Sequence, residues 1–147
     1  MRTVTRNLKQ KGGKMATHNE VGARGEFEVY SILSQIGTVS FDAKADLCFE
    51  GVEIEIKTAR PSRYANRENG YHYQFCLQKK GHTNFTKADV LILICLDMQG
   101  KPRTAFVIPT EQLRRDRKKL TIPYSLDTRL NSYRERWEVI AQYAEGA

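Results

Sequence analysis

The chain has 147 residues, of which 24 are Lys or Arg and 17 are Asp or Glu, so its formal net charge is +7 at pH 7 with His neutral. This length predicts one domain rather than two. A hydrophobic fraction of 40% suffices to build a core, which excludes a wholly disordered chain. The longest nearly apolar run, Val90 to Leu96, is too short to span a bilayer. No apolar segment follows the basic start, so we expect an intracellular protein with no membrane partner.

Positive charge concentrates in two segments. Residues 1–14 carry five Lys or Arg and no acid, which predicts a basic flexible arm over residues 1–19 ahead of a domain over 20–147. Residues 111–119 hold five basic residues against two acids. Both segments suit a polyanion, although a solvated tail and a solvent-facing surface explain the charge equally well.

The three cysteines, Cys48, Cys76 and Cys95, are odd in number, lie far apart and each sit in an apolar run. That spacing matches neither a disulfide framework nor a CxxC zinc site. We therefore expect buried thiols without a disulfide.

Hydrophobic periodicity predicts the elements in chain order. A helix is expected over residues 20–36, ended by Gly37. Alternating or wholly apolar runs then predict strands over residues 39–41, 45–49, 52–58, 71–78, 90–96 and 104–108. The run over 90–96 is apolar on both faces, which predicts a central strand covered by helices. Thr110 is expected to cap a helix running to about Lys119, and Ser132 with Glu135 forms a capping-box pattern for a last helix ending near Tyr143. This order predicts one α/β domain with a mixed central sheet flanked by helices.

Two acidic side chains are brought together if Glu50 and Gly51 form a two-residue hairpin turn. Phe49 then faces Val52, and counting outward from the turn places Asp46 opposite Glu55. Directly opposed side chains have β-carbons roughly 5 Å apart. The strand period puts Lys57 on the same face as Glu55.

Facing carboxylates repel each other unless a cation lies between them. Oxygen ligands are what Mg²⁺ requires, and water and substrate phosphate fill its other positions. Lys57 adds positive charge beside that site, which suits metal-assisted phosphodiester hydrolysis. The alternative is that Glu53, Glu55 and Lys57 are merely the solvated face of an amphipathic strand.

Asp46 followed by Glu55-Ile56-Lys57 resembles the signature of the PD-(D/E)XK nuclease superfamily. Ala45 stands where Pro is frequent in that family. The resemblance covers about residues 20–108 and implies a restriction-endonuclease-like core and Mg²⁺, or Mn²⁺, as cofactor. It implies that Asp46, Glu55 and the backbone carbonyl of Ile56 bind the metal.

The Gly25-Glu26 step is similar to a helical Gly-Glu step of archaeal Holliday junction resolvases, which would make Glu26 a further catalytic acid. Glu26 lies at one edge of the apolar stripe of its helix and Glu28 at the other. Either acid is therefore a candidate, and Glu26 is favoured by the resemblance alone.

The resemblance implies a second core helix between the Glu-x-Lys strand and the later buried strand. Because residues 71–78 alternate as a strand, only Lys79 to Asp89 remain for that crossover. Some branches of the family carry a Gln that contacts the site, and Gln74 and Gln78 are equivalent candidates. Other candidate DNA contacts are Arg24, Lys44, Arg60, Arg63, Lys79 and Lys80.

These observations predict a Mg²⁺-dependent DNA endonuclease that needs no small-molecule cofactor. A homodimer is expected by analogy with the family, because one active site cuts one strand. The resemblance admits a junction resolvase, a homing nuclease, a restriction enzyme or a repair enzyme. A non-catalytic nucleic-acid-binding module and an RNA-processing nuclease remain the alternatives.

Overall fold

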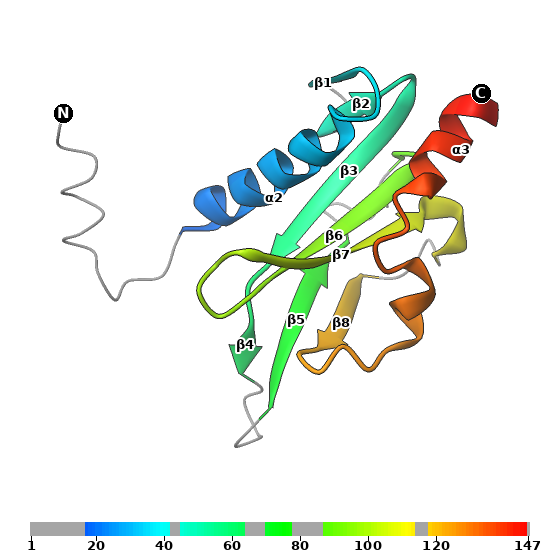
Figure 1. Ribbon diagram of the computed structural model, residues 1–147. Helices are drawn as coiled ribbons and strands as arrows, with labels where there is room; N and C mark the ends of the chain where they lie inside the picture. Colours follow the sequence, from blue (N-terminus) through cyan, green and yellow to red (C-terminus); the bar gives the residue numbers. More distant parts are fainter. Residues whose placement is uncertain (1–16, 42–44, 64–69, 78–86, 114–117, 147) are drawn as a thin grey trace, which may run out of the picture.

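The computed structural model of the chain describes residues 17–41, 45–63, 70–77, 87–113 and 118–146. They form a mixed five-stranded sheet, a smaller three-stranded sheet and two α-helices (Figure 1). This confirms the predicted single α/β domain. No helix in these ranges is long and apolar enough to cross a membrane.

The five-stranded sheet has the order β1-β2-β3-β6-β7. β3 and β6 are parallel, and the other neighbouring pairs are antiparallel. The bounds are β1 (Val39–Phe41), β2 (Leu47–Phe49), β3 (Val52–Ala59), β6 (Val90–Leu96) and β7 (Pro102–Pro109).

Two layers cover the two faces of this sheet. Helices α2 (His18–Leu33) and α3 (Glu138–Gly146) contribute Val29, Leu33 and Ile140 to a core on one face. The smaller sheet covers the other face, with the order β4-β5-β8. Its strands are β4 (Ser62–Arg63), β5 (Tyr71–Cys76) and β8 (Lys119–Pro123).

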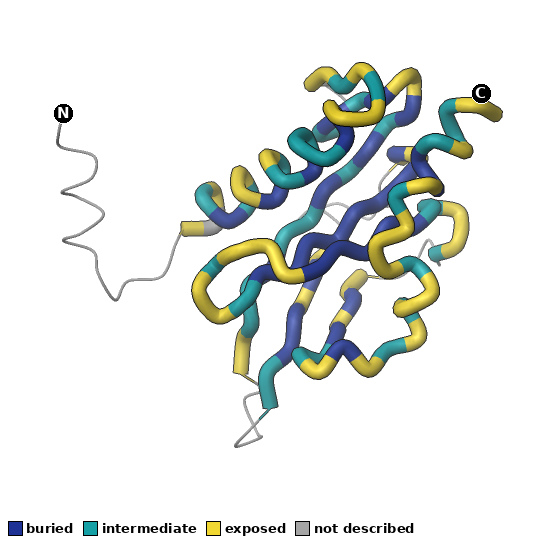
Figure 2. The backbone as a smooth tube through the Cα atoms, viewed as in Figure 1, coloured by how far each residue is buried: buried dark blue, intermediate teal, exposed yellow. Residues whose placement is uncertain are grey.

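Strand β6 is buried along its whole length, as Figure 2 shows by colour. Ile92 and Ile94 join the core under the helices, whereas Leu91 and Leu93 join the core under the smaller sheet. The continuous apolar run of β6 therefore reflects a strand covered on both faces, as predicted. The expectation that helices supply both covers is wrong, because a β-sheet supplies one of them.

The connection between the parallel strands β3 and β6 passes through β4 and β5. In the described part of this connection, strands stand where the resemblance implied a second core helix. The remaining segment proposed for a crossover lies mostly outside the described residues.

Helix α2 begins at His18, earlier than predicted, because Thr17 and Glu20 form a capping box. The Glu20 amide donates to Thr17 Oγ1 at 3.2 Å, and Glu20 Oε1 accepts from the Thr17 amide at 3.3 Å. The helix ends at Leu33 with Ser34 as C-cap, before the predicted stop at Gly37. Of the predicted arm over residues 1–19, residues 1–16 lie outside the described ranges. Its last three residues instead form the cap and the start of α2.

The helix predicted from Thr110 to Lys119 is wrong. A 3₁₀ turn covers Thr110–Gln112, residues 114–117 lie outside the described ranges, and Lys119 already belongs to β8. Leu120 and Ile122 alternate with exposed neighbours and are buried against β5 and β6. The alternation of buried and exposed residues in β8, together with its pairing to β5, therefore overrides the local capping signal at Thr110.

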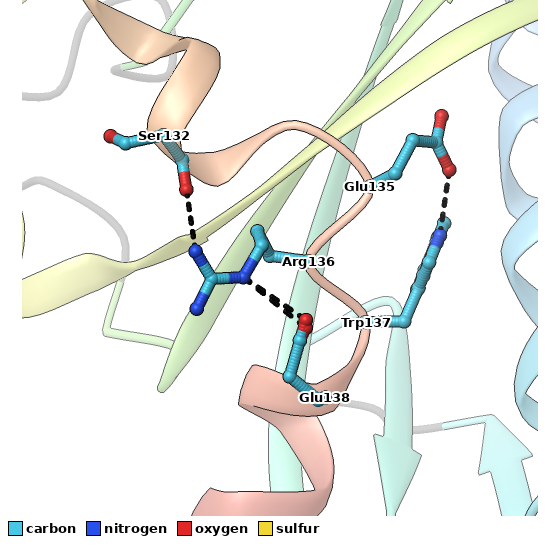
Figure 3. A network of polar contacts seen from close by, with 5 residues as sticks. All are labelled: Ser132, Glu135, Arg136, Trp137 and Glu138. Atoms are coloured by element: carbon cyan, nitrogen blue, oxygen red, sulfur yellow. Dashed lines mark hydrogen bonds and ion pairs between the residues drawn. The ribbon is translucent and has the colours of Figure 1, made fainter.

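The predicted opening of the last helix at Ser132 and Glu135 is also wrong (Figure 3). Residues Arg129–Tyr133 form a 3₁₀ helix, and α3 begins only at Glu138. Glu135 has a φ of 54°, and its Oε2 accepts from the Ala105 amide at 2.8 Å. Its Oε1 accepts from Trp137 Nε1 at 2.8 Å. Glu135 thus saturates the outer edge of β7 instead of capping a helix.

The cysteines form no disulfide. Cys95 is buried, and desolvation raises the pKa of its thiol to about 12. Cys48 is half-buried and Cys76 is exposed, so the prediction of buried thiols holds only for Cys95.

Candidate active site

The site is built on the hairpin between β2 and β3. Glu50 and Gly51 have φ values of 50° and 88°, which is the geometry of a tight turn with two left-handed residues. Phe49 pairs with Val52 and Leu47 with Ile54. The predicted register is therefore confirmed over the whole β2–β3 ladder.

The paired register ends at Leu47, and Asp46 directly precedes β2. Its amide donates to the carbonyl oxygen of Ile54 at 3.1 Å. Its carboxylate Oδ2 accepts from the amide of Ile56 at 2.7 Å. The bond to Ile54 falls one residue short of the predicted register, so the strict pairing that would set Asp46 opposite Glu55 does not extend to Asp46. The Asp46 carboxylate instead lies at the edge of β3, on the amide of Ile56.

The Ile56 backbone faces the same edge. In an extended strand the N–H and C=O of one residue point to the same side. Because the Ile56 N–H points to Asp46, its carbonyl oxygen also points to the β2 side. The pairing of β3 with β2 ends at Ile54. The Asp46 carboxylate and the Ile56 carbonyl, two oxygen groups of the kind that bind cations, thus both lie where β2 and β3 diverge.

Glu55 and Lys57 lie on the other face of β3 from Ile54 and Ile56, which are buried under the helices. Lys57 Nζ is 3.4 Å from Glu55 Oε2. The side chain of Glu55 is 17% exposed and that of Lys57 is 28% exposed, so water screens this ion pair only in part. A carboxylate and an ammonium group therefore stand together on this face of β3, one residue to either side of Ile56, whose amide bonds Asp46.

Helix α2 approaches β3 closely at Gly25. A β-carbon at this position would overlap Thr58 Oγ1, so only glycine allows the observed distance. Thr58 Oγ1 is buried without a hydrogen-bond partner in the structure. No sequence pattern predicts this role of Thr58, because Gly25 and Thr58 lie far apart in the chain.

This approach brings Glu26 to the acids of the hairpin. The pKa of Glu26 is raised from its ordinary 4.5, first by burial and then by the negative charges of Asp46 and Glu55. Glu28 instead lines a small cavity of about 50 Å³ with Ile94 and Thr104. Of the two candidate acids, the structure brings only Glu26 into the field of the hairpin carboxylates.

Among the described residues, no three His, Cys, Asp or Glu side chains are close enough to hold a metal ion by themselves. The donors at the hairpin are two carboxylates and one backbone carbonyl. Mg²⁺ binds through one or two carboxylates and keeps several waters, whereas Zn²⁺ prefers a closed set of Cys and His ligands. The donor set at Asp46, Glu55 and Ile56 fits a hydrated hard cation.

The predicted DNA contacts do not all gather at the site. Arg24 donates to the carbonyl oxygen of Gly100 at 3.2 Å, which ties α2 to the turn between β6 and β7. Arg60 is half-buried at the end of β3, and Arg63 is exposed, with its guanidinium 5.8 Å from the centre of the Tyr71 ring. Gln74 is exposed on β5. The candidates Lys44, Gln78, Lys79 and Lys80 lie outside the described residues.

Comparison with known proteins gives a likeness in fold. No family model and no curated protein match the sequence. Among solved structures, the chain is similar to a bacterial homing endonuclease, I-Ssp6803I, with a TM-score of 0.60 and 14% sequence identity. The similarity covers 88% of this chain and 96% of that chain. This domain therefore has the fold of a known endonuclease.

Proposed function

We propose that this protein is a metal-dependent endonuclease that hydrolyses phosphodiester bonds of DNA, with Mg²⁺ or Mn²⁺ as cofactor. The observation that carries the proposal is the placement of Asp46. Its carboxylate is held on the amide of Ile56, the residue that separates the acidic Glu55 from the basic Lys57 in the chain. The fold shared with a homing endonuclease also supports a function as an endonuclease.

Asp46, Glu55 and the carbonyl of Ile56 would hold the cation. When bound, Mg²⁺ supplies a Lewis acid that lowers the pKa of a water and neutralises phosphate charge. Lys57 donates hydrogen bonds to a phosphate oxygen and stabilises the negative charge that grows there in the transition state. Glu55, paired with Lys57 at 3.4 Å, holds that ammonium group toward the site.

Glu26 has the role of a proton acceptor near the attacking water. Its raised pKa follows from burial and from two neighbouring acids, and a base whose pKa lies closer to the working pH accepts a proton more effectively. This role depends on the close contact of Gly25 with Thr58, which fixes the distance from helix to hairpin.

Positive charge supports a nucleic acid as substrate, and the fold shared with a homing endonuclease favours DNA. The net charge of +7 favours a polyanion, and the exposed Arg63 continues the basic surface beyond the end of β3. Cutting both strands of a duplex needs two copies of this single site, so the proposal includes a homodimer.

Cleavage of a substrate panel tests the proposal. Purified protein is incubated with duplex, single-stranded and branched DNA and with RNA, in Mg²⁺ and in EDTA. We expect cleavage of DNA in Mg²⁺ only, and its loss in Asp46→Asn. Asp127→Asn is the matched control, because Asp127 is an exposed acid on the loop after β8.

Other outcomes select the alternatives. Cleavage of RNA alone would assign an RNA-processing nuclease. Salt-sensitive DNA binding that is indifferent to Mg²⁺, with every substrate left intact, would assign a non-catalytic binding module.

A further inference from the structure

An exposed aromatic surface lies on α2 and the neighbouring strand β1. Among the described residues, four large hydrophobic side chains are exposed, and two of them are Phe27, 72% exposed, and Phe41, 73% exposed. Phe41 stacks on Tyr30, with ring centres 5.6 Å apart and ring planes 13° from parallel. Phe27 precedes Tyr30 by three residues, so the two side chains are neighbours on the helix surface. Phe27, Tyr30 and Phe41 therefore form one surface, which we call the aromatic platform.

The aromatic platform borders the candidate active site on the sheet. Figure 1 shows β1 beside α2, and in the sheet Phe41 pairs with Leu47 of β2. Asp46 directly precedes Leu47. Paired Cα atoms lie at most about 5.5 Å apart and consecutive ones about 3.8 Å apart. The Cα atoms of Phe41 and Asp46 are therefore within roughly 10 Å of each other.

The helix brings the aromatic platform to the same acids. At about 100° per residue, Tyr30 lies between Glu26 and Phe27 around the helix axis. Burial and then the negative charges of Asp46 and Glu55 raise the pKa of Glu26, which shows that Glu26 is close to the hairpin acids. The platform thus begins next to a residue of the candidate site on both α2 and β2.

We propose that the aromatic platform stacks on one unpaired nucleobase of the substrate, next to the phosphate that is cleaved. The inference rests on the proposed function for its ligand, and it adds a substrate class: DNA with an unpaired nucleotide at the position of cleavage. Only one sugar separates a phosphate from the base of its nucleotide, so a phosphate at the hairpin leaves that base within reach of the platform. Stacking of this kind accepts any base, because every base has a π face.

The stacked pair has the shape that an unpaired base requires. One face of the Phe41 ring lies against Tyr30, while most of the Phe41 side chain is exposed. A planar base can therefore continue the stack on the free face of Phe41. A side chain that inserts between two base pairs needs both of its faces free, and Phe41 has only one. In a continuous duplex the faces of the bases are already covered by their neighbours, so the base must be an unpaired one.

The area of the aromatic platform favours a small flat ligand over a second copy of the chain. A Phe side chain offers about 150–250 Å², so the exposed parts of Phe27 and Phe41 amount to roughly 300 Å². A stable interface between two proteins needs about 800 Å² from each partner. Apolar side chains that gather on one surface mark a binding site, and one nucleobase fits the area available here.

Binding to three duplexes of the same sequence, in EDTA so that no cleavage occurs, tests the inference. One duplex is continuous, the second carries one extra unpaired adenine, and the third carries an abasic residue in place of that adenine. We expect the wild-type protein to bind the unpaired adenine roughly 5- to 150-fold more tightly than the abasic residue. The continuous duplex should bind no more tightly than the abasic one. This comparison needs no variant, because the second and third duplexes differ only in the base.

Variants assign the preference to the aromatic platform. Phe41→Ala should bind the unpaired adenine and the abasic residue equally, and Phe27→Ala should reduce the preference. Phe41→Trp should keep it, because Trp also has a flat ring system, whereas Phe41→Leu, which is apolar but not planar, should lose most of it. Met98→Ala is the matched control, because Met98 is another exposed hydrophobic residue, on the turn between β6 and β7.

Equal affinity of the wild-type protein for the unpaired adenine and the abasic residue would overturn the inference, and so would an unchanged preference in Phe41→Ala. If the platform instead binds a second copy, Phe41→Ala would dissociate a dimer in analytical ultracentrifugation and leave the relative affinities for the three duplexes unchanged, which also overturns it. In Mg²⁺ the cut should fall beside the unpaired adenine, and a cut placed without regard to that base would contradict the inference. Base-dependent binding without cleavage of any substrate would leave this inference standing and reject the proposed enzyme.

Discussion

The carboxylate of Asp46 and the amide of Ile56 are joined by a hydrogen bond of 2.7 Å, at the point where β2 leaves β3. This hydrogen bond has a structural role and a chemical role. It satisfies a backbone donor that the strand partner no longer reaches, and it fixes a carboxylate at the edge of β3. Substitution of Asp46 should affect the two roles differently.

Asp46→Asn should separate the structural role of the Asp46 side chain from its chemical role. An Asn oxygen still accepts from the Ile56 amide, so we expect the free energy of unfolding to change little, while cleavage falls roughly 10²-fold because the negative charge is lost. Asp46→Ala should lose cleavage and also about 1–2 kcal/mol of stability, since the amide loses its partner. Urea unfolding and initial cleavage rates measure the two effects. Full cleavage by Asp46→Asn would contradict the proposed role of the charge.

Lys57→Met should lower the cleavage rate by roughly 10²- to 10³-fold, because the transition state loses a hydrogen-bond donor and a positive charge. Binding of duplex in EDTA should weaken much less. Lys101→Met is the control, since Lys101 is exposed at the turn between β6 and β7 and lies outside the site. Undiminished cleavage by Lys57→Met would remove this mechanism.

Gly25→Ala should destabilise the fold, whereas Gly22→Ala should not. A β-carbon at residue 25 would overlap the Thr58 side chain, and crowding of this kind costs about 1–3 kcal/mol. A β-carbon at residue 22 meets no atom within 4 Å, so alanine there should stabilise the helix by about 0.5–1 kcal/mol. Chemical unfolding of both variants provides the comparison. Equal stabilities would show that α2 can move away from β3.

Glu26→Gln should raise stability at neutral pH. The pKa of Glu26 is raised above 4.5 in the folded chain by burial and by Asp46 and Glu55. The folded state therefore holds its proton more tightly than the unfolded state, and this contribution to stability is present below 4.5 and is lost as pH rises through the folded pKa.

The gain in stability of the Glu26→Gln variant should thus appear at pH values above the pKa that Glu26 has in the folded chain, and it should vanish at lower pH. We expect less than about 1 kcal/mol, because the carboxylate is partly exposed and screened by water. Thermal unfolding at a series of pH values measures it. A gain that persists unchanged below pH 4.5 would show that charge is not its cause. If the proposed cation site is correct, added Mg²⁺ should reduce the difference between the two proteins.

Local sequence determined the parts that depend on near neighbours. The Glu50-Gly51 turn fixes the β2–β3 register, because the two left-handed residues allow one hairpin geometry. The predicted opposition of Asp46 and Glu55 is not reached, because the pairing ends at Leu47 and the Asp46 amide bonds Ile54. The apolar run from Val90 to Leu96 likewise determined a strand covered on both faces. The hairpin register and the covered strand are each set by spacing within a few residues.

Tertiary structure decided the features in which distant segments compete. Thr110 carries a helix signal, which is overridden by the pairing of β8 with β5 and the burial of Leu120 and Ile122. Ser132 carries another, which is overridden by the bonding of Glu135 to the edge of β7. The choice between Glu26 and Glu28 depends on how α2 lies on β3 at Gly25. A capping signal is worth about 1 kcal/mol, whereas each buried Leu or Ile side chain contributes about 1.5–3 kcal/mol. Burial between segments far apart in the chain therefore wins over local preference, and it becomes visible only when those segments are packed together.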